Sequence, residues 1–330
     1  MSYVIAAPYS RGPGTFPRMR GRTGRFPAIF LVIVAVTELA AFFVVWHVFV
    51  HTRTGQMIDT IGLNGNRFGR DQVAGLTDTA LDAVSVASLA IATAVIVCIA
   101  LLRRRILLAF MAALLIGGTN LATQLVKHLT VRPDYGIDPE RVFAGNSLPS
   151  GHTAVAASVA VALVLVLPPK IRGVAGVLGA AYAGFVGIAT LSAGWHRPSD
   201  AIASLLLVGV GAAVVGVPLV LAHHRGRVEP GPPHWIAVTV LLIAAIGLLL
   251  GAALGLALTQ QVVDVPPEAL SQRRFFVAYV GGAAGIAGVA AMTMALVLAT
   301  VHWVVPRRVH DRPPRHVVSS PHHHRRMVSR

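Results

Sequence analysis

The feature that most constrains this chain is a series of long apolar segments separated by short polar ones. About 20 consecutive apolar residues suffice for a helix to cross the hydrocarbon core of a bilayer. Only 12% of the 330 residues are charged, roughly half the share found in soluble proteins. The sequence therefore predicts an all-α polytopic membrane protein with eight spans. These are Ala28–Val50, Leu81–Leu102, Ile106–Val126, His152–Leu167, Gly173–Ala193, Ala201–Ala222, Trp235–Gln260 and Phe275–Val305.

Charged residues are distributed unevenly between the two ends of these spans. Cytoplasmic segments of membrane proteins carry an excess of Lys and Arg, so we expect both termini in the cytoplasm. The net charge of +15 then indicates topology and contact with anionic headgroups, and not nucleic-acid binding. Basic residues gather in 1–27, 103–105, 168–172, 223–234 and 306–330, and most acidic residues in 51–80, 127–151, 194–200 and 261–274.

Four regions follow from this pattern. We expect a disordered basic tail at 1–27, a six-span core at 28–222, two additional transmembrane helices at 223–305 and a second disordered basic tail at 306–330. The polar stretch 51–80 is expected to be an outer loop that holds short surface helices.

Two isolated residues inside apolar segments need an interpretation. Cys98 is the single cysteine, which excludes a disulfide framework and a cysteine-based metal site. Glu38 is the one acid well inside a predicted span. Intramembrane carboxylates are often functional, but no partner is evident, so a packing role and a functional role both stay open.

A first candidate site is the tetrapeptide Pro149-Ser150-Gly151-His152, at the start of the fourth span. Backbone N–H groups at a helix start, together with the helix dipole, favour a bound anion. The His152 imidazole could supply a proton there.

A second cluster, His196 to Asp200, precedes the sixth span. Pro198 suits the first position of a helix. Asp200 would then lie in the first turn, from which it can reach back to His196. Such a contact would make one ring nitrogen a donor and leave the other as a nucleophile or base. The alternative is an N-capping Asp beside an interfacial His.

The predicted topology puts both clusters on the outer side, where Lys127 and Arg132 also lie, in the loop after the third span. Their spacing lets both side chains reach one phosphate. Contact with lipid headgroups is the alternative for each taken singly.

Together these residues resemble the type 2 phosphatidic acid phosphatase (PAP2) superfamily, whose fold is shared with vanadium haloperoxidases. Pro149-Ser150-Gly151-His152 resembles the second family motif, and His196 with Asp200 the end of the third. Lys127 and Arg132-Pro133 resemble the first motif, with four residues between Lys and Arg where six are usual. The resemblance extends over about Leu81–Ala222.

The resemblance implies a lipid phosphatase that uses neither metal nor cofactor. His196 would attack phosphorus to form a phosphohistidine, Asp200 would orient it, and His152 would protonate the leaving oxygen and later activate water. The equatorial oxygens would be bound by Lys127, Arg132 and the Ser150 and Gly151 amides. The expected substrate is a polyprenyl pyrophosphate, a phosphatidate or a phosphatidylglycerophosphate, at the extracytoplasmic face of a bacterial plasma membrane.

One position departs from the family pattern. The arginine of the third motif would fall at Thr190, so Arg197 or Arg141 would have to supply that charge. This departure motivates an alternative, a catalytically weak protein that binds or transfers lipid phosphates. A further alternative is an unrelated eight-span transporter, which the scarcity of mid-span charge disfavours. The sequence indicates no oligomeric state.

Overall fold

The computed structural model describes residues 25–68, 86–138, 145–223, 228–229, 232–266, 269–305 and 307–308. This part of the chain is almost entirely helical, which confirms the all-α prediction for it. Its α-helices are α1 (Arg25–His51), α2 (Arg53–Asn64), α4 (Val86–Leu102), α5 (Ile106–Leu129), α6 (Gly151–Val166), α7 (Pro169–Ser192), α8 (Pro198–His223), α9 (Trp235–Gln260) and α10 (Gln272–Val304). A 3-10 helix, η1 (Gly65–Phe68), follows α2, and β1 (Val228–Glu229) pairs antiparallel with β2 (Arg307–Arg308).

Each of the eight predicted spans coincides with a helix. Six of these, α1, α5, α7, α8, α9 and α10, are long and apolar enough to cross a membrane, while α4 and α6 are apolar but shorter. The start of the second predicted span, at Leu81, lies outside the described residues, as do most of the two tails. The apolar helices identify an integral membrane protein. Eight crossings, and both ends in the cytoplasm, stay predictions.

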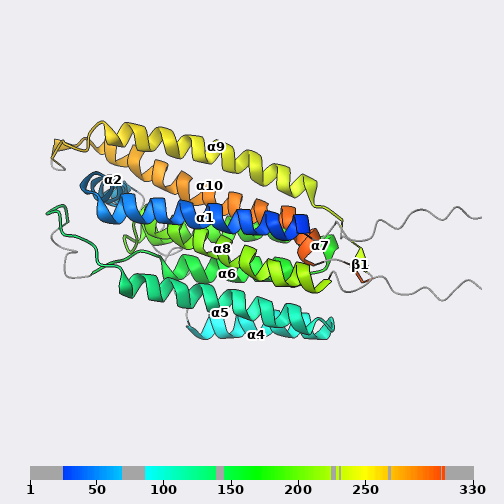
Figure 1. Ribbon diagram of the computed structural model, residues 1–330. Coiled ribbons are helices and arrows are strands. Elements are labelled where there is room, and N and C mark those ends of the chain that lie inside the picture. The colour runs from blue at the N-terminus through cyan, green and yellow to red at the C-terminus, as the bar shows by residue number, and fades with distance from the viewer. Residues whose placement is uncertain are drawn as a thin grey trace, which may run out of the picture.

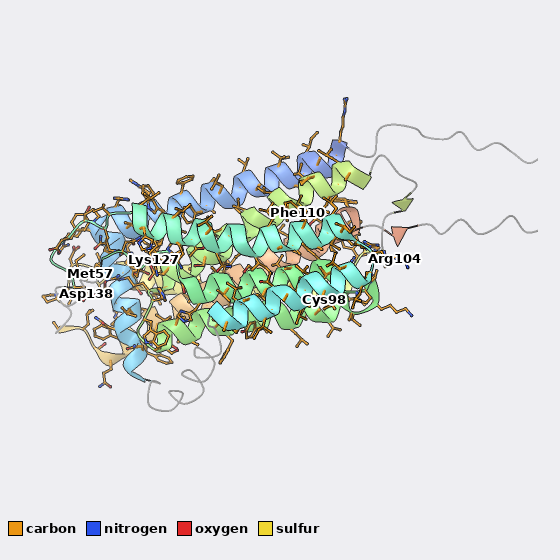
Figure 2. The ribbon with its side chains drawn as sticks, turned by 90° about the horizontal axis from the view of Figure 1, so that it is seen from below. Met57, Cys98, Arg104, Phe110, Lys127 and Asp138 are labelled. Atoms are coloured by element: carbon orange, nitrogen blue, oxygen red, sulfur yellow. The ribbon has the colours of Figure 1, made fainter. Side chains whose placement is uncertain are left out.

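The long helices run side by side, with α9 and α10 along one side of the bundle and α4 and α5 along the other (Figure 1). α1 begins and α10 ends at one end of the bundle, and α2 lies at the opposite end. Figure 2 shows Met57 of α2 at the same end as Lys127 and Asp138, with Arg104 at the far end. The polar candidate residues and the basic turn therefore lie at opposite ends, as the charge pattern predicts.

Within the stretch 51–80 the structure differs from the expected surface loop. The Thr52 hydroxyl caps α2 by accepting the Gly55 N–H at 3.0 Å. Met57 and Ile61 are buried on one face of α2 and pack with Ala278 of α10. A helix with one apolar stripe buries that stripe against its neighbours. α2 is thus not a surface helix but a buried part of this end of the bundle.

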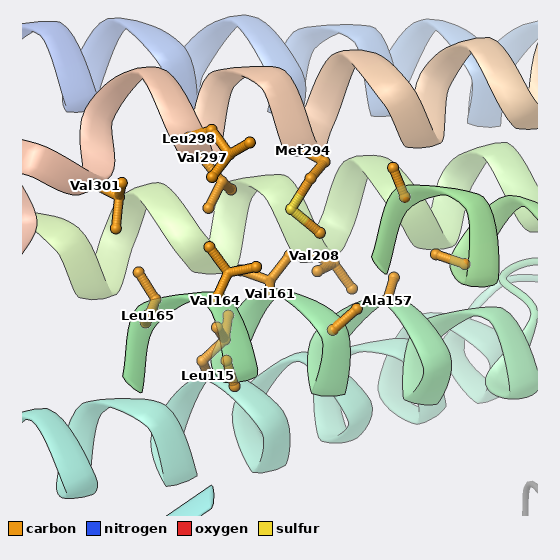
Figure 3. Close-up of a cluster of buried hydrophobic side chains, with 14 of the residues drawn as sticks. Leu115, Ala157, Val161, Val164, Leu165, Val208, Met294, Val297, Leu298 and Val301 are labelled. Carbon is orange, nitrogen blue, oxygen red and sulfur yellow. The ribbon is translucent and has the colours of Figure 1, made fainter. Parts of the chain in front are cut away.

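The centre of the bundle lies where α6 and α10 approach each other. Figure 3 shows Val161 and Val164 of α6 and Met294 and Leu298 of α10 projecting into the space between the two helices. In a membrane, helix association depends on such packing, since lipid tails are as apolar as the side chains. α10, which the sequence indicated only as an addition to a six-span core, is therefore a central element that packs against α7, α8 and α9.

Glu38 lies near the middle of α1 and is 6% exposed. The Thr293 hydroxyl of α10 donates to its Oε1 at 3.5 Å. The Glu38 carboxyl group lies against Gly209 of α8 and occupies the space that a side chain at position 209 would need. Glu38 thus joins three helices through one polar contact and one close approach.

Replacing Gly209 by alanine is expected to destabilise the protein by about 1–3 kcal/mol, because the new methyl group would overlap the Glu38 carboxyl group. The thermal unfolding midpoint of the purified protein in detergent measures the effect. Gly247→Ala is the matched control, since a methyl group there meets none of the described atoms within 4 Å. Equal midpoints for the two variants would contradict this account of Gly209.

Candidate functional site

The pairing of His196 with Asp200 arises at the turn between α7 and α8. α8 begins at Pro198, as predicted, and Asp200 lies in its first turn. Asp200 Oδ2 accepts the Arg197 N–H at 2.9 Å and lies 3.2 Å from Nδ1 of His196. His196 is 8% exposed and Asp200 is fully buried. The Asp200 carboxylate therefore both caps α8 and contacts Nδ1 of His196. The other ring nitrogen, Nε2, is not involved in this contact.

The tetrapeptide Pro149 to His152 is joined directly to this turn. Ser150 caps α6, and its hydroxyl accepts the Thr153 N–H at 3.4 Å. The Ser150 N–H donates to the Asp200 carbonyl at 3.0 Å, and the Ser204 hydroxyl donates to the Ser150 carbonyl at 2.7 Å. The amide of Ser150, expected to face phosphate, is thus used to join the starts of α6 and α8.

His152 lies in the first turn of α6, close to His196. Its ring centroid is 5.4 Å from that of Trp195. The charges of His196 and Lys127 both act on His152 electrostatically. Lys127 lies in the last turn of α5, so three separate helices bring these groups to one place. The structure thus brings the predicted histidines, Lys127 and Asp200 together.

Arg132 completes the predicted group from the loop after α5. Its Nη1 donates to the Phe49 carbonyl at 3.1 Å, and its Nη2 lies 3.7 Å from Oδ1 of Asp200. The side chain is 8% exposed. Burial lowers the pKa of Arg132, and the Asp200 carboxylate opposes that shift. Within the described part of the chain, its Nε and Nη2 have no hydrogen-bond partner, so two buried donors remain available beside the His196–Asp200 pair.

A second carboxylate, that of Asp59 in α2, belongs to this region and was not predicted. Its Oδ1 accepts the Ser199 N–H at 3.1 Å and its Oδ2 accepts the Ser199 hydroxyl at 2.5 Å. About one helical turn earlier in α2, Gln56 Nε2 donates to the Pro133 carbonyl at 2.9 Å. α2 therefore holds both the loop of Arg132 and the start of α8. The apolar pair Met57 and Ile61, one helical turn apart, is the sequence feature that could have indicated a buried helix here.

Replacing Asp59 by asparagine is expected to remove a pH dependence of stability between about pH 4 and 6. Burial first, and the Asp200 charge second, raise the pKa of Asp59 from 3.8 to about 6. Because the folded-state pKa lies above the unfolded one, the protonated form favours the fold. That stability is present below the unfolded pKa and is lost as pH rises through the folded one, up to roughly 3 kcal/mol.

The measurement is the thermal midpoint of wild type and Asp59→Asn across this pH range. The wild-type advantage should fall as pH rises. Asp264→Asn is the control, because that carboxylate is 91% exposed. A difference that stays constant with pH would contradict the assignment.

Thr190 is the residue at which the resemblance leads us to expect the third-motif arginine. Its side chain is fully buried and donates to the Gly187 carbonyl at 2.8 Å. Its own carbonyl accepts the N–H groups of Trp195 at 3.0 Å and His196 at 3.2 Å. Thr190 therefore builds the turn that holds His196 and carries no charge. Arg141, one proposed substitute, lies outside the described residues.

Arg197, the other proposed substitute, is buried next to His196, and its side chain already has two hydrogen-bond partners. Its Nη2 donates to Asp138 Oδ2 at 3.1 Å and its Nη1 to the Ser147 hydroxyl at 3.3 Å. Arg197 and Arg132 line one small pocket of about 50 Å³. Among the described residues, no cluster of three or more His, Cys, Asp or Glu is placed to hold a metal ion.

Comparison with known proteins agrees with this geometry. Residues 105–225 match the family model of the PAP2 superfamily. This segment contains Lys127, the tetrapeptide before α6 and the His196–Asp200 turn. No curated protein and no solved structure matches the chain. The resemblance inferred from the three motifs is thereby confirmed, and the chain is an integral membrane protein whose residues 105–225 match the PAP2 superfamily.

Proposed function

We propose that this protein is a lipid phosphatase that hydrolyses a lipid phosphate or pyrophosphate through a phosphohistidine intermediate. The PAP2 superfamily suggests a phosphatase-type function for a membrane protein. The observation that carries the proposal is the Arg132 guanidinium. It is buried beside the His196–Asp200 pair, and its Nε and Nη2 have no hydrogen-bond partner among the described residues, although Nη2 lies 3.7 Å from Asp200 Oδ1. Buried donors of this kind suit the charge of a phosphoryl group.

The proposed reaction has two displacements. In the first, Nε2 of His196 attacks phosphorus and the bond from phosphorus to the lipid oxygen breaks, while His152 gives that oxygen a proton. In the second, His152 accepts a proton from water, whose oxygen attacks phosphorus. The phosphorus–nitrogen bond then breaks, and phosphate and His196 are released. Asp200 keeps Nδ1 of His196 protonated throughout.

Binding of the phosphoryl oxygens is assigned to Lys127, Arg132 and the Gly151 amide. The start of α6 adds its dipole to these charges. In the proposed mechanism Ser150 acts on α6 itself, because its N–H and hydroxyl are bonded within the protein. Phosphoryl transfer is catalysed mainly by positioning and electrostatic stabilisation, which these groups would supply.

We place the reaction at the extracytoplasmic face of a bacterial plasma membrane. Support comes from the basic turn at Arg104, at the end of the bundle opposite Lys127, because basic turns are typical of the cytoplasmic side. The lipid phosphates exposed at the outer face are then the available substrates.

Phosphate release by the purified protein, measured with polyprenyl pyrophosphate, phosphatidate and phosphatidylglycerophosphate in detergent micelles, tests the proposal. We expect release from at least one of these lipids, with no loss of activity in a chelator. Binding of these lipids without phosphate release would favour the second candidate, a lipid-phosphate binding or transfer protein. The second candidate is supported by Thr190, which is uncharged where the resemblance leads us to expect an arginine.

A further inference from the structure

One cavity among the described residues lies outside the group of residues assigned to the reaction. It has a volume of about 210 Å³ and is lined by α2, α8, α9, α10 and the end of α1. Its walls are mainly apolar, and they include Ile202 of α8, Leu249 and Leu256 of α9 and Val289 of α10. α9 and α10 follow the PAP2 region, so the cavity depends on helices that the family match does not cover.

The chemistry of this cavity favours a hydrocarbon occupant. Engineered apolar cavities of about 150 Å³ stay dry and take up apolar ligands. Two polar groups in the wall, the Ser199 hydroxyl and the Asp59 carboxylate, are hydrogen-bonded to each other. The hydroxyl of Thr259 donates a hydrogen bond to the Gly255 carbonyl at 2.7 Å. These polar groups therefore have partners already, and the remaining surface offers dispersion contacts with an apolar chain.

The position of the cavity connects it to the proposed reaction. Pro198 and Ser199 form part of its wall and follow His196 by two and three residues. The α9 segment in its wall is the last part of that helix and the α10 segment the first half. The cavity therefore lies at the same end of the bundle as His196, at the depth of the outer half of the apolar region.

We propose that this cavity binds the apolar chain of the lipid whose phosphate is bound at His196. The proposal rests on the proposed function, since it names the part of the substrate that α9 and α10 recognise. Chain recognition then depends on helices outside the PAP2 region, and the Asp59–Ser199 contact separates the apolar chain from the charged groups. The length of chain that the cavity admits would set substrate preference.

Hydrolysis of hexyl and hexadecyl phosphate by cavity variants tests the proposal kinetically. Ala252→Leu fills part of the cavity, and Leu249→Ala enlarges it. We expect the first to lower kcat/KM for hexadecyl phosphate about tenfold, with hexyl phosphate unchanged, because several buried methylene groups lose their contacts. Leu249→Ala should shift the preference toward bulkier chains. Ala257→Leu, on an exposed position of α9 outside the cavity, should behave as wild type.

A binding experiment separates this proposal from the proposed function. A hexadecyl phosphonate with a photoreactive group at the chain end cannot be hydrolysed, and its crosslinks are mapped by mass spectrometry. We expect labelling of α9 and α10 at the cavity, reduced by Ala252→Leu and not by Ala257→Leu, whether or not phosphate release is found. Labelling elsewhere, or equal labelling by the matching neutral alcohol, would overturn the proposal, since an uncharged lipid would then fill the cavity as well.

Discussion

Replacing His196 by alanine is expected to lower the rate of phosphate release from a lipid phosphate by roughly 10⁴-fold or more. Loss of a nucleophile removes the covalent step itself, and comparable losses in other hydrolases are of this size or larger. His196 is suited to this part because Asp200 lies 3.2 Å from its Nδ1, so that Nδ1 can donate to the carboxylate and Nε2 can act as the nucleophile. Its turn is fixed by the Thr190 carbonyl, so the ring has a defined direction before substrate arrives.

Two measurements check this prediction. The first is the initial rate of phosphate release at saturating substrate for wild type, His196→Ala and the control His128→Ala, an exposed histidine on α5. The second is an alkaline quench after mixing with radiolabelled substrate, which preserves phosphohistidine. Wild type should retain label on the protein and His196→Ala should not. Equal release by wild type and His196→Ala would remove the enzymatic interpretation.

Replacing Asp200 by asparagine is expected to lower the same rate by about 10³–10⁴-fold, the loss found when the carboxylate that orients a catalytic histidine becomes an amide. The amide can present its N–H to Nδ1 and so hold the wrong tautomer of His196. Arg132, 3.7 Å away, would lose its neighbouring negative charge. Breaking a buried charge pair in this way destabilises a protein by about 3–5 kcal/mol.

The rate and the thermal midpoint are both needed for Asp200→Asn, because a loss of folding alone would also lower activity. The rate should fall even at temperatures where the variant is fully folded. Asp264→Asn is the matched control, since its exposed pair with Arg53, at 4.0 Å, should contribute almost nothing. A folded Asp200→Asn protein with near-normal activity would show that His196 does not depend on this carboxylate.

The parts of the site that could be predicted from sequence are those built from local spacing. His196 and Asp200 are four residues apart around a helix start, so helix geometry alone brings them together. Ser150 followed by an apolar run is likewise a recognisable N-cap. The 3.7 Å approach of Arg132 to Asp200 needed the tertiary fold, because it depends on how the loop after α5 crosses the bundle end.

The fold could be predicted to a similar extent. Long apolar runs define helices, but a run that is apolar on every side does not reveal which neighbours it has. α9 and α10 look alike in sequence, yet most of α10 is buried among other helices while most of α9 faces outward. Asp59 was missed for a related reason. Its partner Ser199 is 140 residues away in sequence, and a polar stretch between two spans resembles an ordinary loop.

That separation has a consequence for how the protein is made. α2 emerges from the ribosome before α8, so the Asp59 carboxylate has no Ser199 to accept from until the five described α-helices α4 to α8 have been reached in synthesis. Gln56 similarly waits for the loop at Pro133. The contacts of α2 with Ser199 and Pro133 can therefore form only after these later segments have been synthesised. The order of synthesis thus means that the polar contacts around His196 cannot be complete before the start of α8 has been made.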